Sequence, residues 1–288
     1  MEAWQIMRFQ KHRLVFVSMM AISAFVWLQM AIYLLHEVFG LRPKWNLLQY
    51  CVAAVSEQTV LNQIVLIGLN GIMAYSIGMI IWFIGQQAVM ERRWLARMKM
   101  NRHNRLSKQL NRKYRSLGYE ITVIRHDSML ALTFGFIRPR ILVSTALLSN
   151  FTEREMDAIV LHEVSHCRNY DPLRLLLVKM MKDSLPFIPV LHRMSHYIEV
   201  WVELEADRYA IEQMKSPIDL ANVLLRYSRF SQRSLVGVGF ADEAINYRLQ
   251  QLIEPKSKIR VPILNIIPLS ISSLMIFIIS NIFVSGCA

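Results

Sequence analysis

The stretch Thr152–Asn169 reads T-E-R-E-M-D-A-I-V-L-H-E-V-S-H-C-R-N, and it decides the fold of the water-exposed part of the chain. Its first four residues have the form of a capping box, in which a threonine and a glutamate three residues later satisfy free N–H groups at a helix start. Apolar residues then recur at helical spacing at Met156, Ile159 and Val160. The pattern predicts a helix that begins after the threonine and ends near Asn169.

Within this helix, His162-Glu163-Val164-Ser165-His166 matches the pattern H-E-x-x-H. Residues four apart on a helix lie about 40° apart around its axis, so both imidazoles can reach one ion at about 2.0–2.1 Å, the usual zinc–nitrogen distance. Glu163 lies between them and can act as general base and then as general acid. With 8 histidines in 288 residues the pattern arises by chance about once in a hundred sequences, so it needs support from a further ligand.

A third ligand would complete such a site, and a helix expected over roughly residues 190–214 offers several acids. They are Glu199, Glu203, Glu205 and Asp207. Glu203 and Asp207 are four residues apart and share a helix face, whereas Glu205 lies on another. One acid of the pair can bind the metal while the other holds a ligand histidine, and spacing alone leaves open which does which.

A rival histidine pair has the same spacing. His192 and His196 are also four residues apart, with Glu199 and Glu203 near the same helix face. This pair has no glutamate between the histidines to act as a base, so it is the weaker candidate for a catalytic metal site.

The segments around the metal helix predict a small α+β domain. Short β-branched or apolar runs at residues 120–125, 130–134 and 140–144 favour a sheet of about three strands. Asp171-Pro172 ends the metal helix and opens another, and Ser216-Pro217 begins a further one. A last helix is expected over Asp242–Ile253.

Three long stretches contain no Asp, Glu, Lys or Arg. They are Leu14–Leu35 with 22 residues, Val60–Ile84 with 25 and Val261–Val284 with 24. A helix needs about 20 residues to cross the hydrocarbon core, so a purely soluble globule is excluded. The first run is too long for a secretory core region and is interpreted as a retained anchor. The fold class predicted is an α-helical membrane protein with about three transmembrane helices and one water-exposed α+β domain.

The expected organisation follows from these runs. Residues 1–36 form the N-terminal segment and first membrane helix, 37–59 an external loop, 60–85 the second membrane helix, 86–118 a basic juxtamembrane helix, 119–260 the water-exposed domain, and 261–288 the C-terminal membrane helix. Leu173–Leu191 is apolar but interrupted by charges and two prolines, so we expect it to be membrane-associated, on the surface or partly re-entrant.

Charge placement orients the chain. Residues 86–118 hold ten Lys and Arg and a single acid, and an excess of Lys and Arg marks the cytoplasmic side. In a bacterial plasma membrane, the N-terminus and residues 86–260 are therefore expected on the cytoplasmic side. The 36–59 loop and the C-terminus are expected on the outer side. The basic run could bind nucleic acid, but the neighbouring span favours anionic lipid.

Cysteine usage carries little information. Cys51, Cys167 and Cys287 have neither metal-site nor disulfide spacing. The sequence Val284-Ser-Gly-Cys287-Ala resembles a lipoprotein cleavage box at the wrong terminus, so we interpret it as the small-residue end of a membrane helix.

Several segments together resemble one known family. They are Ala131–Leu142 (A-L-T-F-G-F-I-R-P-R-I-L), Phe151–Leu173, Pro186–Leu191, Glu203–Asp207 and Tyr247–Leu249. In this order and spacing the chain is similar to the BlaR/MecR-type antirepressor membrane metallopeptidases over about Ala131–Leu252.

The resemblance implies a cytoplasmic gluzincin domain of zincin-like fold. It implies one Zn²⁺ per chain on His162, His166 and Glu203, with Glu163 catalytic and Asp207 supporting a ligand histidine. In related membrane gluzincins a strand like Arg140–Ser144 borders the cleft. A peptide is therefore expected to bind along the residues of that strand, namely Ile141, Leu142 and Val143.

The chain also departs from the best-known members of that family. No penicillin-binding sensor domain is expected after the last span, and the external loop has only about two dozen residues, so β-lactam sensing is not carried over. Three functions remain: a regulatory protease, plausibly of a winged-helix repressor, a quality-control protease like the HtpX-type gluzincins, or a non-proteolytic zinc-containing scaffold. Glu163 argues against the scaffold, because a structural zinc site needs no base.

Overall fold

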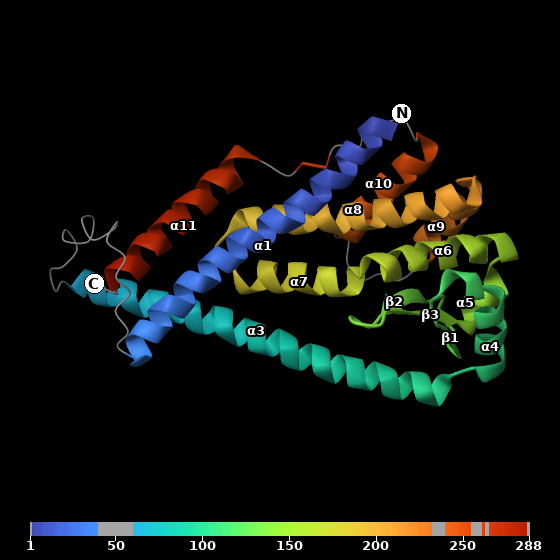
Figure 1. Cartoon of the computed structure of the whole chain (residues 1–288), viewed down its shortest axis with the longest axis horizontal. Coiled ribbons are helices and arrows are strands. Elements are labelled where there is room, and N and C mark those ends of the chain that lie inside the picture. The colour runs from blue at the N-terminus through green and yellow to red at the C-terminus, as the bar shows by residue number, and fades with distance from the viewer. Residues whose placement is uncertain (1, 40–59, 232–239, 255–260, 263–264, 287–288) are drawn as a thin grey trace. The chain divides into compact units, whose positions relative to one another are not determined.

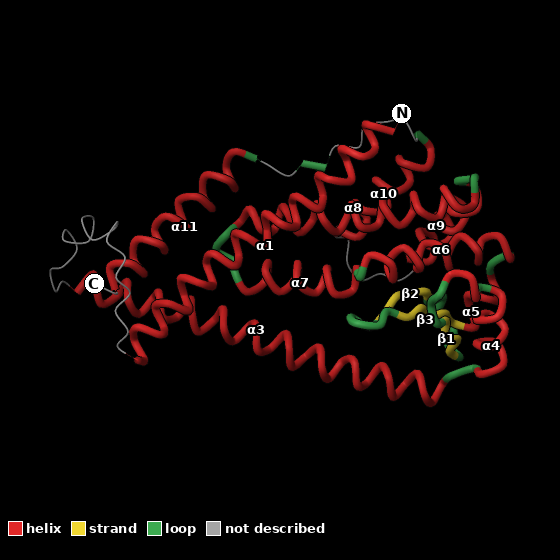
Figure 2. Tube along the Cα trace, in the orientation of Figure 1, coloured by secondary structure: helices red, strands yellow, loops and turns green. Residues whose placement is uncertain are grey.

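The computed structural model describes residues 2–39, 60–231, 240–254, 261–262 and 265–286. The expected lipoprotein-like cysteine and nearly all of the expected external loop lie outside these residues. The chain divides into two compact units. The apolar unit comprises Met1–Gly85, Val178–Tyr197 and Pro262–Ala288, and the mixed unit comprises Gln86–Leu177 and Ile198–Val261. The chain is mostly helical, and its strands belong to the mixed unit (Figures 1 and 2).

The apolar unit is built on three helices. They are α1 (Glu2–Phe39), α3 (Val60–Asn101, which continues into the mixed unit) and α11 (Ile266–Gly286). Lys11–Leu35 in α1 and Asn70–Ala96 in α3 are long and apolar enough to cross a membrane. These two spans agree with the first two predicted ones. In α11 the apolar stretch Ile266–Ser280 is shorter, so the third span stays a prediction.

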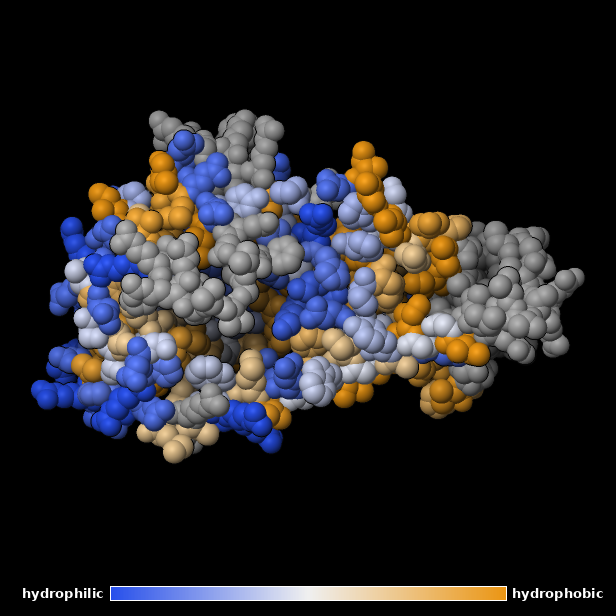
Figure 3. Space-filling view, turned by 180° about the vertical axis from the view of Figure 1, so that it is seen from behind, coloured by the Kyte–Doolittle hydropathy of each residue, from blue (hydrophilic) through white to orange (hydrophobic). Residues whose placement is uncertain are grey.

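Helix α1 exposes large apolar side chains in addition to burying them. Its buried residues Met19, Ser23, Val26, Met30 and Tyr33 recur at intervals of four and three. Other large apolar side chains, among them Leu14, Val17, Phe25 and Leu28, are half or more exposed. Hydrophobic side chains also gather over one part of the surface in Figure 3. An apolar outer face of this extent is typical of a membrane contact.

Residues 178–197 pack with the apolar helices, and serine hydroxyls of those helices hydrogen-bond to backbone groups of this segment. Ser76 of α3 donates to the carbonyl of Ser184 at 2.8 Å, and Ser272 of α11 accepts from the N–H of Val190 at 2.9 Å. The carbonyl and the N–H belong to the end of α7 (Asp171–Ser184) and the start of α8 (Pro189–Met214), where helical backbone groups lack intrahelical partners. These contacts join the connection to the apolar helices, and its expected membrane association stays a prediction.

The mixed unit contains a three-stranded sheet at the predicted positions. Strands β1 (Ile121–Ile124), β2 (Ala131–Phe134) and β3 (Arg140–Ser144) form the order β1-β3-β2. β3 runs parallel to β1, with Val123 opposite Val143, and antiparallel to β2, with Thr133 opposite Ile141. Gly135, at φ 90°, allows the turn between β2 and β3, because a Cβ there would lie 2.9 Å from the carbonyl oxygen of Arg138.

The sheet order corrects one sequence-based expectation. Ile141, Leu142 and Val143 lie in the middle strand, are 0% exposed, and have neighbouring strands on both sides. A peptide cannot add to a strand whose two edges are occupied. The free edge among the described residues belongs to β2, because residues 101–103 already pair with the outer edge of β1.

The expected single basic helix over residues 86–118 is also corrected. Residues 86–101 continue α3, and a separate helix α4 (Asn104–Lys113) and a 3₁₀ turn (Arg115–Leu117) follow. The break occurs because the backbone leaves the helix to bond the sheet: His103 N–H donates to Val123 at 2.8 Å, and Arg125 N–H donates to Asn101 at 2.8 Å.

The remaining helices agree closely with the predicted bounds. They are α6 (Glu153–Asn169), α7, α8, α9 (Ile218–Ser231) and α10 (Phe240–Ile253), with the short α5 (Thr145–Asn150) not anticipated. Val160 and Val164 of α6 pack in one core with Val123 and Val143 of the sheet. This core places α6 against the sheet and against α9, and so fixes the face on which its histidines lie.

Candidate functional site

Helix α6 carries the H-E-x-x-H motif, and local sequence sets where it begins and ends. The Thr152 hydroxyl accepts from the N–H of Glu155 at 3.3 Å, and the Glu155 carboxylate accepts from the N–H of Thr152 at 2.8 Å, which completes the expected capping box. Tyr170, in the left-handed conformation at φ 54°, ends the helix. The ends of α6 are therefore set by local capping, and His162 and His166 lie in its buried second half.

The two histidines converge on one point. Their Nε2 atoms lie 3.1 Å apart, and their rings meet edge to face with centroids 4.7 Å apart. Each Nδ1 faces a buried carboxylate: that of His162 lies 2.9 Å from Asp207 Oδ1, and that of His166 lies 2.9 Å from Asp171 Oδ2. The Nδ1 of His166 hydrogen-bonds its acid, whereas the Nδ1 of His162 is close to Asp207 without the geometry of a hydrogen bond. In each neutral imidazole Nε2 is then the nitrogen left to bind a cation.

Glu203 of α8 supplies the third donor, a carboxylate oxygen. Its carboxylate oxygens lie 3.5 Å from His162 Nε2 and 3.7 Å from His166 Nε2. Two donors bound to one tetrahedral zinc are roughly 3.3 Å apart, and the three donor pairs fall around that value. In the described part of the chain these three residues form the one group of His, Cys, Asp and Glu side chains close enough to hold a metal ion. These residues therefore fit a metal ion such as zinc, which they would hold with two nitrogens and one carboxylate oxygen.

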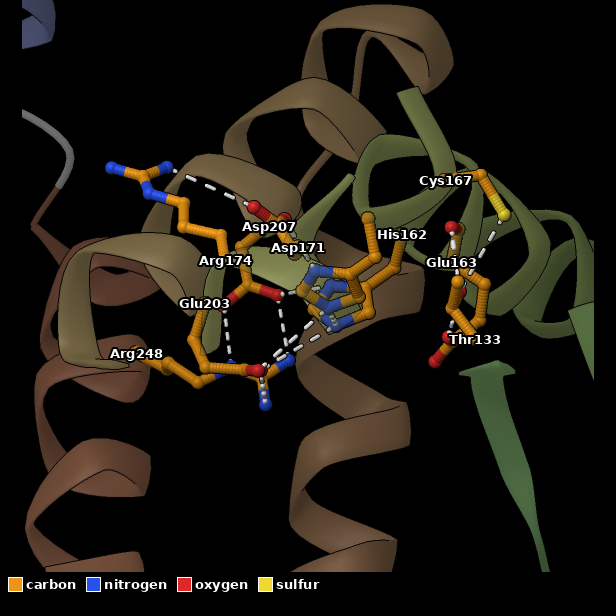
Figure 4. Close-up of polar contacts among 10 residues, drawn as sticks. Thr133, His162, Glu163, Cys167, Asp171, Arg174, Glu203, Asp207 and Arg248 are labelled. Atoms are coloured by element: carbon orange, nitrogen blue, oxygen red, sulfur yellow. Dashed lines mark hydrogen bonds and ion pairs between the residues drawn. The ribbon is translucent and has the colours of Figure 1, made fainter. Parts of the chain in front are cut away.

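Arg248 of α10 connects the two acids of α8. Its Nε and one terminal nitrogen each donate to Asp207 at 2.7 Å, and its other terminal nitrogen lies 2.9 Å from Glu203 Oε2 (Figure 4). The bidentate geometry is the strongest form of an arginine–carboxylate pair. Asp207 is 0% exposed, so without this arginine its charge would be buried with only an imidazole beside it.

The electrostatics of the site favour ionised carboxylates. Burial lowers the pKa of His162, but the contacts with Asp207 and Glu203 outweigh burial and raise that pKa to about 9. Burial raises the pKa of Glu203, but His162 and Arg248 outweigh burial and hold it well below its usual range. The pKa of Asp207 is lowered against burial chiefly by Arg248. The site thus presents stable anions to a cation.

Glu163 lies beside the histidines and is held by the sheet. The hydroxyl of Thr133 on β2 lies 2.8 Å from Glu163 Oε2 and 3.0 Å from the backbone oxygen of Glu163. Glu163 is buried and lines the same cavity as the histidines. A carboxylate at this place can receive a proton from a molecule bound in the cavity.

A cavity of about 480 Å³ is lined by His162, Glu163, His166, Glu203 and Arg248. On one side it is lined by Ala131, Leu132 and Thr133 of β2, the strand with the free edge. Most of the remaining wall is apolar, with Ile159, Leu175, Leu220, Leu224 and Ile245 among its residues. An extended chain along β2 would therefore pass the histidines, with apolar pockets for its side chains.

The rival histidine pair is not part of this site. His192 and His196 belong to the segment Val178–Tyr197 of the apolar unit, and His192 is exposed. Neither belongs to the group of donors that could hold a metal among the described residues. Glu199 and Glu205 also lie outside that group.

Sequence reasoning did not assign roles to three residues of the site: Asp171, Arg248 and Thr133. Asp171 was interpreted as a helix boundary, yet the tight turn at Tyr170 brings it back to His166, five residues earlier. Arg248 belonged to a segment quoted for the family resemblance, and that was its only signal. Thr133 gave no signal of its own, because a threonine in a strand is ordinary.

A buried helical H-E-x-x-H pair completed by a glutamate from a second helix is the arrangement of zincin-type metallopeptidases. The model of the BlaR1 peptidase M56 family matches residues 16–252, and the chain belongs to this family. Membership implies a metallopeptidase and confirms the resemblance inferred from the sequence.

Two curated relatives, both described as regulatory protein BlaR1, match part of the chain. That of Bacillus licheniformis is 28% identical over 105 residues, which cover 36% of this chain and 17% of the relative. That of Staphylococcus aureus is 24% identical over 114 residues, covering 40% of this chain and 19% of the relative. The chain thus spans less than a fifth of the length of these relatives.

Proposed function

We propose that this chain is a membrane-embedded zinc metalloendopeptidase that cleaves a protein substrate. The observation that carries the proposal is the convergence of His162 Nε2, His166 Nε2 and the Glu203 carboxylate at separations of 3.1–3.7 Å, with Glu163 beside them. Both histidines and the glutamate have outer partners that orient them, which is how catalytic metal ligands are held.

In this mechanism each residue has a separate task. His162, His166 and Glu203 would hold the zinc ion, which supplies Lewis acidity that polarises the scissile carbonyl. Glu163 accepts a proton from the attacking water and then donates it to the leaving amine. Asp207 and Asp171 keep Nδ1 of the two histidines protonated, and Arg248 holds Glu203 and Asp207 in place.

The substrate is proposed to bind as an extended peptide along the free edge of β2. Backbone groups of Ala131–Phe134 would pair with it, and the apolar wall of the cavity would accept apolar side chains next to the scissile bond. This proposal replaces the β3 residues expected from the sequence.

We further propose that the cleavage is regulatory, for instance the inactivation of a winged-helix repressor. The two curated relatives are described as regulatory proteins, which supports this class of substrate. Charge placement supports a cytoplasmic catalytic domain with the C-terminus outside, because the segment between α3 and the sheet is strongly basic. An alkaline-phosphatase fusion active at Gly118 would contradict this orientation.

The proposal is tested with the purified full chain in detergent. We expect about one zinc per chain by elemental analysis, and zinc-dependent cleavage of fluorescein-labelled casein. Glu163→Gln should lower cleavage by about 10²–10⁴-fold while zinc remains bound, because Glu163 is a base and not a ligand. A Glu163→Gln chain that cleaves casein as fast as the wild type would refute the assignment.

The physiological substrate is then identified in cells. Proteins that lose an internal peptide bond in the wild-type strain but not in the Glu163→Gln strain are its candidate substrates. A repressor among them would support the regulatory role, and a broad set of membrane proteins would favour quality control.

A further inference from the structure

Thr133 contacts the motif helix at two residues. Its hydroxyl oxygen lies 2.8 Å from Glu163 Oε2, 3.0 Å from the Glu163 backbone oxygen and 3.7 Å from the Sγ of Cys167 (Figure 4). The hydroxyl is the one side-chain group from the sheet that the described residues place on the Glu163 carboxylate. The contact joins a strand residue to a helix residue 30 positions away.

A hydroxyl has one proton to donate, so the acceptors compete for it. The Glu163 backbone oxygen is an interior helical carbonyl that already faces the N–H of Cys167 one turn on. The Glu163 carboxylate oxygen is also the closer acceptor, at 2.8 Å against 3.0 Å. The Cys167 thiol is fully buried and can donate its S–H to the hydroxyl oxygen. The O–H of Thr133 therefore points at Glu163 Oε2.

This hydrogen bond restricts the orientation of the Glu163 carboxylate. A glutamate side chain has three rotatable bonds, and Oε2 is tied to β2 by the hydroxyl, which leaves Oε1 to face a reactant. Leu132, the preceding residue, packs instead with Met98 and Leu142, as the alternation of a strand requires. The edge strand that would bind the peptide therefore also sets the position of the base.

We propose that Thr133 is a positioning residue that aligns the Glu163 carboxylate with a peptide bound along β2. The inference rests on the proposed peptidase function. Thr133 acts through Glu163 and, among the described residues, forms no hydrogen bond with the histidines or Glu203. Its effect is therefore on turnover, not on the metal.

The experiment compares two substitutions in the full chain. Thr133→Val keeps the shape of the side chain and removes the donor, whereas Thr133→Ser keeps the donor and removes a methyl group. Thr133→Val should lower kcat for labelled casein about 10- to 100-fold, the usual effect of removing a group that orients a catalytic residue. The KM and the zinc content should change by less than about threefold. Thr133→Ser should retain kcat within about threefold.

Each result decides between positioning and packing. Retained kcat in Thr133→Val overturns the inference, as does an equal loss in Thr133→Ser, which would show that turnover depends on the packing of the whole side chain and not specifically on the hydroxyl. A loss of zinc or a lowered melting temperature parallel to the loss of kcat assigns Thr133 a structural role instead.

The same assays separate this inference from the proposed function. A Glu163→Gln chain as active as the wild type, or a wild-type chain that leaves casein intact, counts against the peptidase assignment on which the inference rests. Normal loss of activity in Glu163→Gln together with a fully active Thr133→Val counts against the positioning role alone.

Discussion

The two units bury polar side chains in different ways. In the described part of the apolar unit the buried polar residues are Ser23, Ser76, Ser184, Ser195, Ser272 and His12. Three of its polar contacts are hydrogen bonds between uncharged groups, including the one between the side chains of Gln29 and Ser280 at 2.9 Å. The mixed unit buries Asp171, Asp207 and two histidines in contact with one another or with Arg248, and buries Glu163 against the hydroxyl of Thr133.

The difference follows from the surroundings. A helix that faces lipid offers an ionised side chain neither a counter-charge nor water. A hydroxyl hydrogen-bonded to a backbone group costs much less free energy to bury there than a charge does. In the mixed unit Asp171 and Asp207 each have a histidine or arginine partner, so these charges are tolerated as a network. Removing one member of such a network should lower the stability of the fold and alter the geometry of the site.

The largest expected effect comes from removing the carboxylate of Asp207, which contacts both His162 and Arg248. Asp207→Ala would leave Arg248 buried with only Glu203 as an anionic partner, and we expect a loss of about 3 kcal/mol in the free energy of unfolding. Thermal or denaturant unfolding of the purified chain measures it. The double variant Asp207→Ala with Arg248→Met should recover part of this loss, because the unpaired charge is then absent. No recovery would mean that packing, not charge, determines the cost.

The next effect concerns the third ligand. Glu203→Gln should weaken zinc binding by at least roughly 100-fold, because removing a residue that merely orients a ligand already costs about 10–100-fold. Asp171→Asn, which keeps the shape beside His166, should stay within that smaller range. Glu205→Gln should be nearly silent, since it lies about 200° around α8 from Glu203. If zinc titration finds that Glu205→Gln weakens binding most, the face of α8 that carries Glu205, and not the face that carries Glu203, supplies the ligand.

The pH dependence of zinc binding tests the same electrostatics. The metal-free pKa of His162 is raised to about 9, so a proton must leave this residue when zinc binds at pH 7. The zinc affinity should therefore rise about tenfold per pH unit for each proton released, up to about pH 9. A raised pKa also stabilises the metal-free fold fully below pH 6.5, and that contribution is lost as the pH rises through 9. Affinity that is flat between pH 7 and 9 would contradict a protonated His162.

The smallest effect is expected in the apolar unit. Ser272→Ala removes the acceptor of the Val190 N–H at the start of α8, and single hydrogen bonds between membrane helices average about 0.6 kcal/mol. Ser273→Ala, at an exposed neighbouring position, is the control. The melting temperature in detergent should fall slightly for the first and not for the second. A loss as large as that of Asp207→Ala would erase the contrast between the two units.

Much of the fold could be predicted because its signals are local. The start of α6 follows from a capping box within four residues, and both of its ends agree with the expected bounds. The three strands and the later helices were found from short runs bounded by Pro, Asp or Ser. The order of the strands could not be found this way, because pairing depends on residues far apart in the chain. The expectation that β3 borders the cleft came from the family resemblance, and the strand order places β3 in the middle of the sheet instead.

The sequence by itself determined which chemistry the chain can carry: two histidines one helical turn apart, a glutamate between them, and apolar runs long enough for a membrane. Periodicity and spacing express these features directly, since they depend only on helix geometry. Only the tertiary structure decided which groups surround them. Asp171, Arg248 and Thr133 come from the start of the next helix, a distant helix and a strand, and they meet the motif because the core packs α6 between the sheet and α9. Buried charges require partners wherever the chain can supply them, and sequence distance does not constrain that choice.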